Sequence, residues 1–223
     1  MIKRTRLADR QLPQYTPAEE SVNTLTHLAG FLFGIAALIL CLFRVKNSSA
    51  IHVISTAIYG CSMILLYAVS SLYHGLKPCL GKKVLQIIDH CTIYLLIAGT
   101  YTPVVLIALR PMYPAVAWGL FITEWTLSAL ATTLTAIDLT KYSKLSMVFY
   151  LGLGWAILPF LPQTLQALGQ HGFLMLLAGG ISYTIGAVLF GIGRKIRWMH
   201  SVFHIFVVAG SVLQFLAIYH YVL

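Results

Sequence analysis

The stretch RKIRWMHSVFHIFVVAGSVLQF, residues 194–215, decides the fold class of this chain. Its first four residues include three basic side chains, and from residue 198 onward it contains no Lys, Arg, Asp or Glu. A passage from a basic segment into an apolar run of about 20 residues is typical of a transmembrane helix entered from an aqueous side. His200 and His204 stand four residues apart in that run and share one helix face. Because ionisable groups inside membrane helices are costly, the histidine pair indicates a functional site.

The rest of the chain repeats this apolar pattern. Of the 223 residues, 59% are hydrophobic and 9% charged, against roughly 45–50% and about 25% in soluble proteins. Each apolar run is long enough to span a bilayer, and the short connections favour antiparallel neighbours. The sequence therefore predicts an all-α integral membrane protein, a seven-transmembrane helix bundle in which residues 22–223 form one domain after a basic segment of residues 1–21. The seven runs are residues 22–43, 51–74, 84–109, 113–136, 145–163, 172–192 and 198–222.

The distribution of Lys and Arg predicts how the bundle is oriented. With the N-terminus in the cytoplasm, twelve of the fifteen Lys and Arg residues fall on the cytoplasmic side, and the outer side keeps Arg44, Lys46 and Arg110. Positive residues concentrate in cytoplasmic loops, so we expect the N-terminus inside and the C-terminus outside. The net charge of +9 then reflects anchoring beside anionic lipids and requires no nucleic-acid partner.

This orientation brings polar residues of three predicted helices to one depth. Ser70 and His74 lie at the cytoplasmic end of the second run, four residues apart and therefore on one face. Asp89 lies one to two turns into the third run, and His200 and His204 occupy a similar level of the last run. The topology thus predicts a single polar layer near the cytoplasmic leaflet.

The residue types in this layer suit a metal ion. Three neutral imidazoles and a water molecule form the open tetrahedral site of a catalytic zinc ion, which makes His74, His200 and His204 candidate ligands. Asp89 could be a fourth ligand or could hold the metal-bound water, and Ser70 could donate to an oxyanion. The alternative is that each histidine only hydrogen-bonds across helices, as polar side chains of membrane helices commonly do.

Two further polar features lie within the apolar runs. Glu20, Asn23 and His27 follow i, i+3, i+7 spacing at the cytoplasmic end of the first helix, so they are predicted to line the same cavity. For Glu20 the alternative is a favourable interaction with the positive end of the helix dipole. Glu124 lies near the middle of the fourth run, where a carboxylate is expected to be protonated or paired, and the sequence names no partner for it.

Four motifs carry a resemblance to a known family. They are SSLYH at residues 70–74, IIDHCTIYLLIAGTYTP at residues 87–103, HSVFH at residues 200–204 and EESVNTLTHLAG at residues 19–30. On these motifs the chain resembles the haemolysin III group of the progestin and adipoQ receptor family, relatives of the adiponectin receptors. The resemblance spans nearly the whole chain.

The resemblance implies a seven-helix membrane protein, N-terminus inside, with a zinc ion near the cytoplasmic face. His74, His200 and His204 would be the zinc ligands, Asp89 would hold the zinc-bound water, and Ser70 would be the serine of the family's SxxxH pattern. Related membrane proteins include alkaline ceramidases, so the family is often regarded as metal-dependent lipid amide hydrolases. Bacterial members have also been called haemolysins or channel proteins and linked to membrane energetics, and the resemblance to them implies a location in a bacterial inner (plasma) membrane.

The sequence-based expectation is therefore a zinc-dependent hydrolase of a lipid amide or ester, with a membrane lipid as substrate or ligand. One alternative is a haemolysin-type pore, although the apolar runs lack the long polar stripe that would line a wide channel. The other is a regulator of membrane homeostasis in which zinc is structural and couples helices. The sequence points to no particular protein partner.

Overall fold

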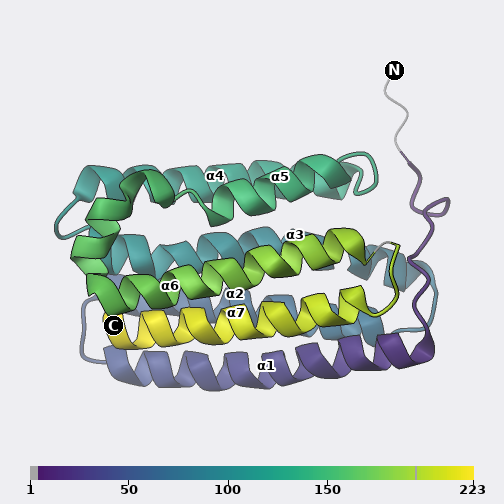
Figure 1. Cartoon of the computed structure of the whole chain (residues 1–223), viewed down its shortest axis with the longest axis horizontal. Coiled ribbons are helices and arrows are strands. Elements are labelled where there is room, and N and C mark those ends of the chain that lie inside the picture. Colours follow the sequence, from purple (N-terminus) through teal and green to yellow (C-terminus); the bar gives the residue numbers. More distant parts are fainter. Residues whose placement is uncertain (1–4, 194) are drawn as a thin grey trace.

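The computed structural model describes residues 5–193 and 195–223, and every regular element in that part of the chain is a helix. Antiparallel helices run side by side along the long axis of the molecule (Figure 1). The elements are α1 (Pro17–Val45), α2 (Ala50–Gly75), α3 (Leu80–Pro103), the π-helix η1 (Val104–Leu109), α4 (Pro114–Ile137), α5 (Ser143–Gly154), the 3₁₀ turn η2 (Leu158–Phe160), α6 (Leu161–Ile192) and α7 (Met199–Tyr221).

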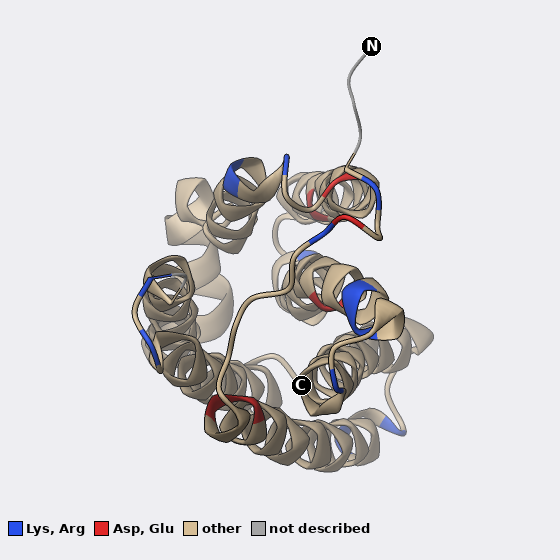
Figure 2. Ribbon diagram, turned by 90° about the vertical axis from the view of Figure 1, so that its right-hand side faces the viewer, with Lys and Arg blue, Asp and Glu red and all other residues tan. Residues whose placement is uncertain are grey.

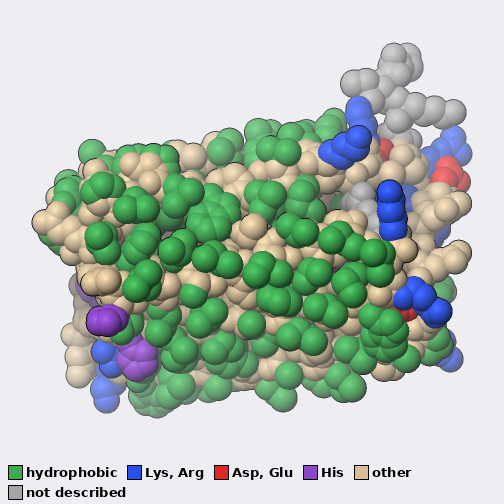
Figure 3. All heavy atoms as spheres, in the orientation of Figure 1, with side chains coloured by type: hydrophobic (Ala, Val, Ile, Leu, Met, Phe, Trp, Pro, Cys, Tyr) green, Lys and Arg blue, Asp and Glu red, His purple; other side chains and the backbone are tan. Residues whose placement is uncertain are grey.

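The surface of the bundle is that of a protein embedded in lipid. Apolar side chains cover the length of the visible face, while Lys, Arg, Asp and Glu gather mostly at one end (Figure 3). Six stretches of the described chain are long and apolar enough to cross a membrane, so the chain is a multi-pass integral membrane protein. They are Pro17–Val45, Ala50–Gly75, Leu80–Leu109, Pro114–Ile137, Ser143–Ile192 and Met199–Tyr221.

The fifth of these stretches differs from the sequence-based expectation. Two separate runs were predicted there, but Ser143–Ile192 is one apolar stretch of 50 residues that contains α5, η2 and α6. Pro159 and Pro162 interrupt it because proline cannot donate a backbone hydrogen bond, and Gly169 turns the chain with φ of 68°. The helical, multi-pass architecture is confirmed, whereas seven crossings and the direction of insertion remain predictions.

The N-terminus of α1 is fixed by a capping box. The Thr16 hydroxyl accepts from the backbone N–H of Glu19 at 3.2 Å, and the Glu19 carboxylate accepts from the backbone N–H of Thr16 at 2.8 Å. Pro17 occupies the first helical turn, where its missing N–H costs nothing. The helix therefore begins at residue 17, before the apolar run that starts at residue 22.

Hydrogen bonds tie four segments together at the end of the bundle where α1 begins. The Asp138 carboxylate after α4 accepts from the backbone N–H of Thr5 at 2.9 Å, and Lys83 at the start of α3 donates to the backbone carbonyl of Ala8 at 2.5 Å. Glu19 accepts from the backbone N–H of Trp198, just before α7, at 2.7 Å. Figure 2 looks at this end and shows Lys and Arg on its loops and helix ends.

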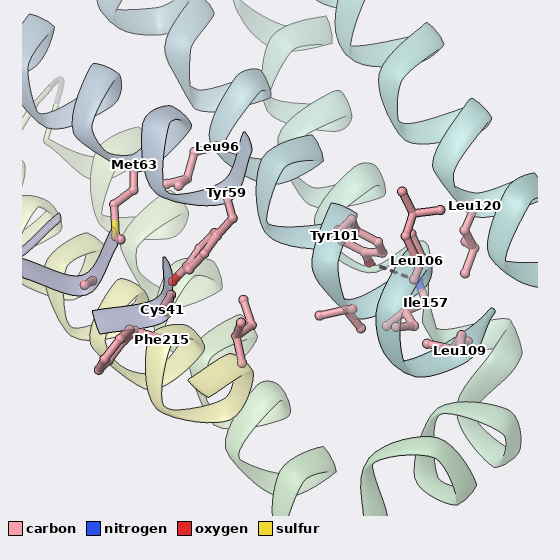
Figure 4. Packing of buried hydrophobic residues seen from close by; sticks show 14 of the residues in the cluster. Cys41, Tyr59, Met63, Leu96, Tyr101, Leu106, Leu109, Leu120, Ile157 and Phe215 are labelled. Atoms are coloured by element: carbon pink, nitrogen blue, oxygen red, sulfur yellow. Dashed lines mark hydrogen bonds between the residues drawn. The ribbon is translucent and has the colours of Figure 1, made fainter. Parts of the chain in front are cut away.

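The interior is packed around buried aromatic residues (Figure 4). Tyr101 of α3 joins two segments, because its hydroxyl accepts from the backbone N–H of Ile157 and donates to the carbonyl of Gly154, both at 3.1 Å. Pro103 follows shortly afterwards and removes a helical donor, and the chain continues as a π-helix. These contacts hold the end of α5 against α3, and the two segments together form part of the wall of a cavity.

Candidate metal centre

Three histidines converge inside the bundle, near the end where α1 begins. His74 comes from the last turn of α2, and His200 and His204 come from the first turns of α7. All three are buried, and their possible ligand atoms lie within 4.8 Å of one another. Nε2 of His200 lies 3.3 Å from Nε2 of His74 and 3.1 Å from Nε2 of His204.

These separations fit a metal ion. With metal–nitrogen bonds of about 2.0–2.1 Å, two nitrogens of a tetrahedral site lie about 3.3–3.4 Å apart. Each neutral imidazole has one nitrogen that donates and one that accepts, so three Nε2 atoms directed at one point leave lone pairs that need a shared proton or a cation. The three histidines therefore form a group able to bind a metal ion.

The polar stripe predicted on α1 lies directly against these histidines. The Glu20 carboxylate is 2.6 Å from Nδ1 of His74, and Nδ2 of Asn23 is 3.4 Å from the same atom. The ring of His27 stacks on that of His204 with centroids 3.7 Å apart. Glu19, and not Glu20, makes the capping box, so helix capping does not account for the position of Glu20.

Ser70 and Asp89 share a cavity with the histidines. They line a space of about 140 Å³ together with His27, His200 and His204. The Asp89 carboxylate lies 3.8 Å from Nδ1 of His90, which also lines the cavity. The predicted site residues thus lie in one region, but of the stripe Glu20, Asn23 and His27 only His27 lines this cavity, while Glu20 and Asn23 contact His74. The catalytic roles of Ser70 and Asp89 remain predictions.

The cavity extends away from the histidines as an apolar chamber. Since one water molecule needs about 10–15 Å³ on this scale, the chamber has room for on the order of ten methylene-sized groups. Its wall is made by α2, α3, α5, α6 and α7, with His27 of α1 beside the polar layer. The residues beyond the polar layer include Leu66, Ile93, Leu96, Ile97, Leu151, Trp155, Ala187, Phe203 and Val207.

A second cavity, of about 460 Å³, opens on the other side of the histidines. This vestibule shares Asp89 and His200 with the apolar chamber and is lined by polar and basic side chains, among them Lys195 and Arg197. The segment before α1 forms part of its wall, and the Tyr15 ring stacks on the His200 ring with centroids 4.8 Å apart and an interplanar angle of 20°. Sequence reasoning missed Tyr15, because a residue outside a helix carries no periodic signal.

The fold and this site define the class of protein. The chain is a multi-pass helical membrane protein with a buried cluster of three histidines. Within this cluster His200 lines both the polar vestibule and the apolar chamber, and His204 lines the chamber. Comparison with known families makes the assignment specific. The family model "Haemolysin-III related" matches residues 15–215, and the chain belongs to that family.

Individual relatives agree with this assignment. The chain is 38% identical over 206 residues to "Hemolysin-3" of Bacillus cereus, covering 92% of each chain. It is 35% identical over 208 residues to "Hemolysin-3 homolog" of Bacillus subtilis (strain 168), covering 93% of this chain and 96% of the relative. It is also 28% identical over 218 residues to the human "Monocyte to macrophage differentiation factor", covering 93% and 87%. The resemblance to the haemolysin III group of the progestin and adipoQ receptor family is confirmed, and the bacterial relatives are consistent with an inner-membrane location.

Proposed function

We propose that this protein is a zinc-dependent hydrolase of a lipid amide or ester. The observation that carries the proposal is that the Nε2 atoms of His74 and His204 lie 3.3 and 3.1 Å from Nε2 of His200, a residue that lines both the apolar chamber and the polar vestibule. An amphipathic substrate matches that junction, because its acyl chain fits the chamber and its polar group fits the vestibule. The bond to be cleaved then lies beside the histidines.

The donor set supports zinc as the metal. Three imidazoles with room for a water molecule are typical of catalytic zinc, whereas closed structural sites are rich in thiolates. The metal-competent group found among the described residues consists of histidines alone. A zinc ion held by His74, His200 and His204 would lower the pKa of a bound water and polarise the substrate carbonyl.

The protein's own residues then have separate tasks. Asp89 accepts the proton of the attacking water, and Ser70, one turn before His74 on α2, donates from its hydroxyl to the developing oxyanion. The apolar wall of the chamber holds the acyl chain and excludes bulk water. The vestibule gives the polar product a route to the aqueous side.

We further propose that the helices make seven crossings and that the end bearing the histidines faces the cytoplasm. The kink at Gly169 and the prolines around η2 divide the 50-residue stretch, which supports two passes there. The excess of Lys and Arg at the end where α1 begins supports its placement on the cytoplasmic side. Accessibility labelling of Cys79 and of engineered single cysteines in the loops, in intact cells, tests this orientation.

The first experiment measures metal content and turnover. Protein purified without chelators is expected to hold one zinc per chain by elemental analysis, and the His200→Ala, His204→Ala double variant to hold none. Wild-type protein that contains no metal under these conditions overturns the proposal. Hydrolysis of ceramide-like lipids is expected in the wild type and lost in Asp89→Ala with zinc retained, and turnover that survives this substitution contradicts the mechanism.

A structural zinc in a homeostasis regulator is the second candidate. The observation that favours it is that the three histidines join α2 to α7, so a metal there would cross-link helices distant in sequence. Removing zinc by chelation separates the two functions, because a structural metal predicts unfolding of the bundle and a catalytic one predicts loss of turnover from a folded protein. The pore suggested by the relatives' printed name "Hemolysin-3" is tested by dye release from liposomes.

A further inference from the structure

We propose that Glu20 is a positioning residue that sets the tautomer and orientation of His74, and that Lys82 holds Glu20 in place. The inference rests on the metal site of the proposed function. It adds a carboxylate that contacts the non-ligating nitrogen of one proposed metal ligand. Glu20, His74 and Lys82 come from α1, α2 and α3, and the Glu20 carboxylate contacts both His74 and Lys82 at 2.6 Å.

The short contact decides which nitrogen of His74 carries the hydrogen. An ionised carboxylate only accepts hydrogen bonds, so Nδ1 must donate to the Glu20 oxygen 2.6 Å away. The Asn23 amide nitrogen, 3.4 Å from the same atom, is at the outer limit of a hydrogen bond, and its amide oxygen already accepts from Ser201 at 2.7 Å. With the hydrogen on Nδ1, Nε2 presents its lone pair to the point where His200 and His204 converge.

Lys82 fixes the position of the Glu20 carboxylate. Its side chain is almost fully buried, and its ammonium group lies 2.6 Å from the second Glu20 oxygen. It also donates to the Leu76 carbonyl at 2.7 Å, at the C-terminus of α2, and lies 3.4 Å from the His74 carbonyl. A buried ammonium group needs a counter-charge, and Glu20 supplies it. The same lysine therefore fixes the carboxylate relative to the helix end that carries His74.

This arrangement matters for metal binding because partners of the non-ligating nitrogen fix ring orientation and raise ligand basicity, and their loss typically weakens metal affinity by about 10–100-fold. Among the described residues, Nδ1 of His204 has no hydrogen-bond partner, so the carboxylate distinguishes His74 from that ligand. In the metal-free protein the Glu20 contact thus fixes the tautomer of His74 and leaves its Nε2 free to bind a metal.

The test measures Zn²⁺ and Co²⁺ affinity of purified, lipid-reconstituted protein by chelator competition. Glu20→Ala is expected to weaken binding about 10–100-fold. Glu20→Gln is expected to lose less, because its amide oxygen still accepts from Nδ1 but carries no charge, and Lys82→Met is expected to lie between them. Asp138→Asn is the matched control, since it removes a buried carboxylate that bonds to backbone N–H groups far from the histidines in sequence, and its affinity should stay within about twofold of the wild type.

A second readout separates positioning from a general structural role. In metal-free protein with ¹⁵N-labelled histidine, the signal that disappears in His74→Asn should report hydrogen on Nδ1 in the wild type and a mixture of tautomers in Glu20→Ala. If Glu20→Ala and Glu20→Gln bind metal as tightly as the control while His74→Asn loses it, the positioning role is refuted and the metal site stands. If the wild type binds neither metal, the proposed function itself fails.

Discussion

Gly30→Ala should destabilise the bundle, because a Cβ at residue 30 would enter the ring of Tyr67. The added carbon would lie 2.6, 2.7 and 2.9 Å from three ring carbons, whereas carbon atoms in contact prefer about 3.5–4.0 Å. The ring must therefore retreat by about 1 Å. It has little freedom to do so, since Tyr67 is fully buried and its hydroxyl is bonded to Ser211 at 2.7 Å.

The size of the effect follows from three contributions. Overpacking of a filled interior costs about 1–3 kcal/mol, and weakening the buried Tyr67 hydrogen bond costs about 0.5–1.5 kcal/mol. Alanine is better than glycine in a helix by about 1 kcal/mol, which offsets part of this loss. The net destabilisation expected for Gly30→Ala is thus about 0.5–3.5 kcal/mol.

Reversible unfolding in mixed detergent micelles measures this difference, with Gly119→Ala as the matched control. No heavy atom lies within 4 Å of a Cβ built at Gly119, so that variant should keep or gain stability. Because the Tyr67 ring meets His27 edge-on at 5.0 Å and His27 stacks on His204, metal affinity should fall as well in Gly30→Ala. Equal stability of the two alanine variants would refute the close contact between α1 and α2.

Three other predictions follow from single sites. Burial raises the pKa of Asp138, but backbone N–H groups of Lys141, Thr5 and Thr140 donate to its carboxylate and hold that pKa at about 2, below its ordinary 3.8. Because the folded-state pKa is depressed, ionised Asp138 should add about 1–2 kcal/mol to the free energy of unfolding above pH 4. This contribution is lost as the pH falls through about 2, so the difference in stability between the wild type and Asp138→Asn should vanish there. Glu124→Leu should raise the free energy of unfolding by about 1–3 kcal/mol, since both carboxylate oxygens are buried without a hydrogen-bond partner among the described residues, and a loss of stability would point to a partner for Glu124. Ala187→Leu narrows the apolar chamber and should lower lipid turnover by at least about tenfold with zinc content unchanged, whereas full turnover would exclude the chamber as the acyl site.

The sequence predicted that the site residues share one depth in the membrane, because the position of a residue along a spanning helix can be counted from the sequence. A spanning helix runs straight across the bilayer, so basic loops and residue counts place each polar side chain at a level. Counting alone therefore put His74, Asp89 and His200 in one layer. In the structure Asp89 and His200 line both cavities, and Nε2 of His74 lies 3.3 Å from Nε2 of His200. What counting could not give was the direction of each imidazole nitrogen.

Local sequence also misplaced some boundaries. The apolar run starting at residue 22 missed the first turn of α1, which the Thr16 capping box stabilises with polar residues. The sequence also did not predict where the stretch Ser143–Ile192 bends, although it marked the apolar runs 145–163 and 172–192 there. The backbone dihedral angles at a kink such as Gly169 depend on packing against other helices.

By itself the sequence determined that this protein is helical, spans the membrane repeatedly and carries polar side chains at one depth, because apolar length, charge distribution and i, i+4 spacing are properties of single segments. Only the tertiary structure decided which nitrogens converge, that Glu20 reaches His74 and Lys82, and that Tyr15 lies on His200. Those contacts join residues on different helices or outside them. Their distances depend on the rotation of each helix about its own axis, which is set by packing across the whole bundle.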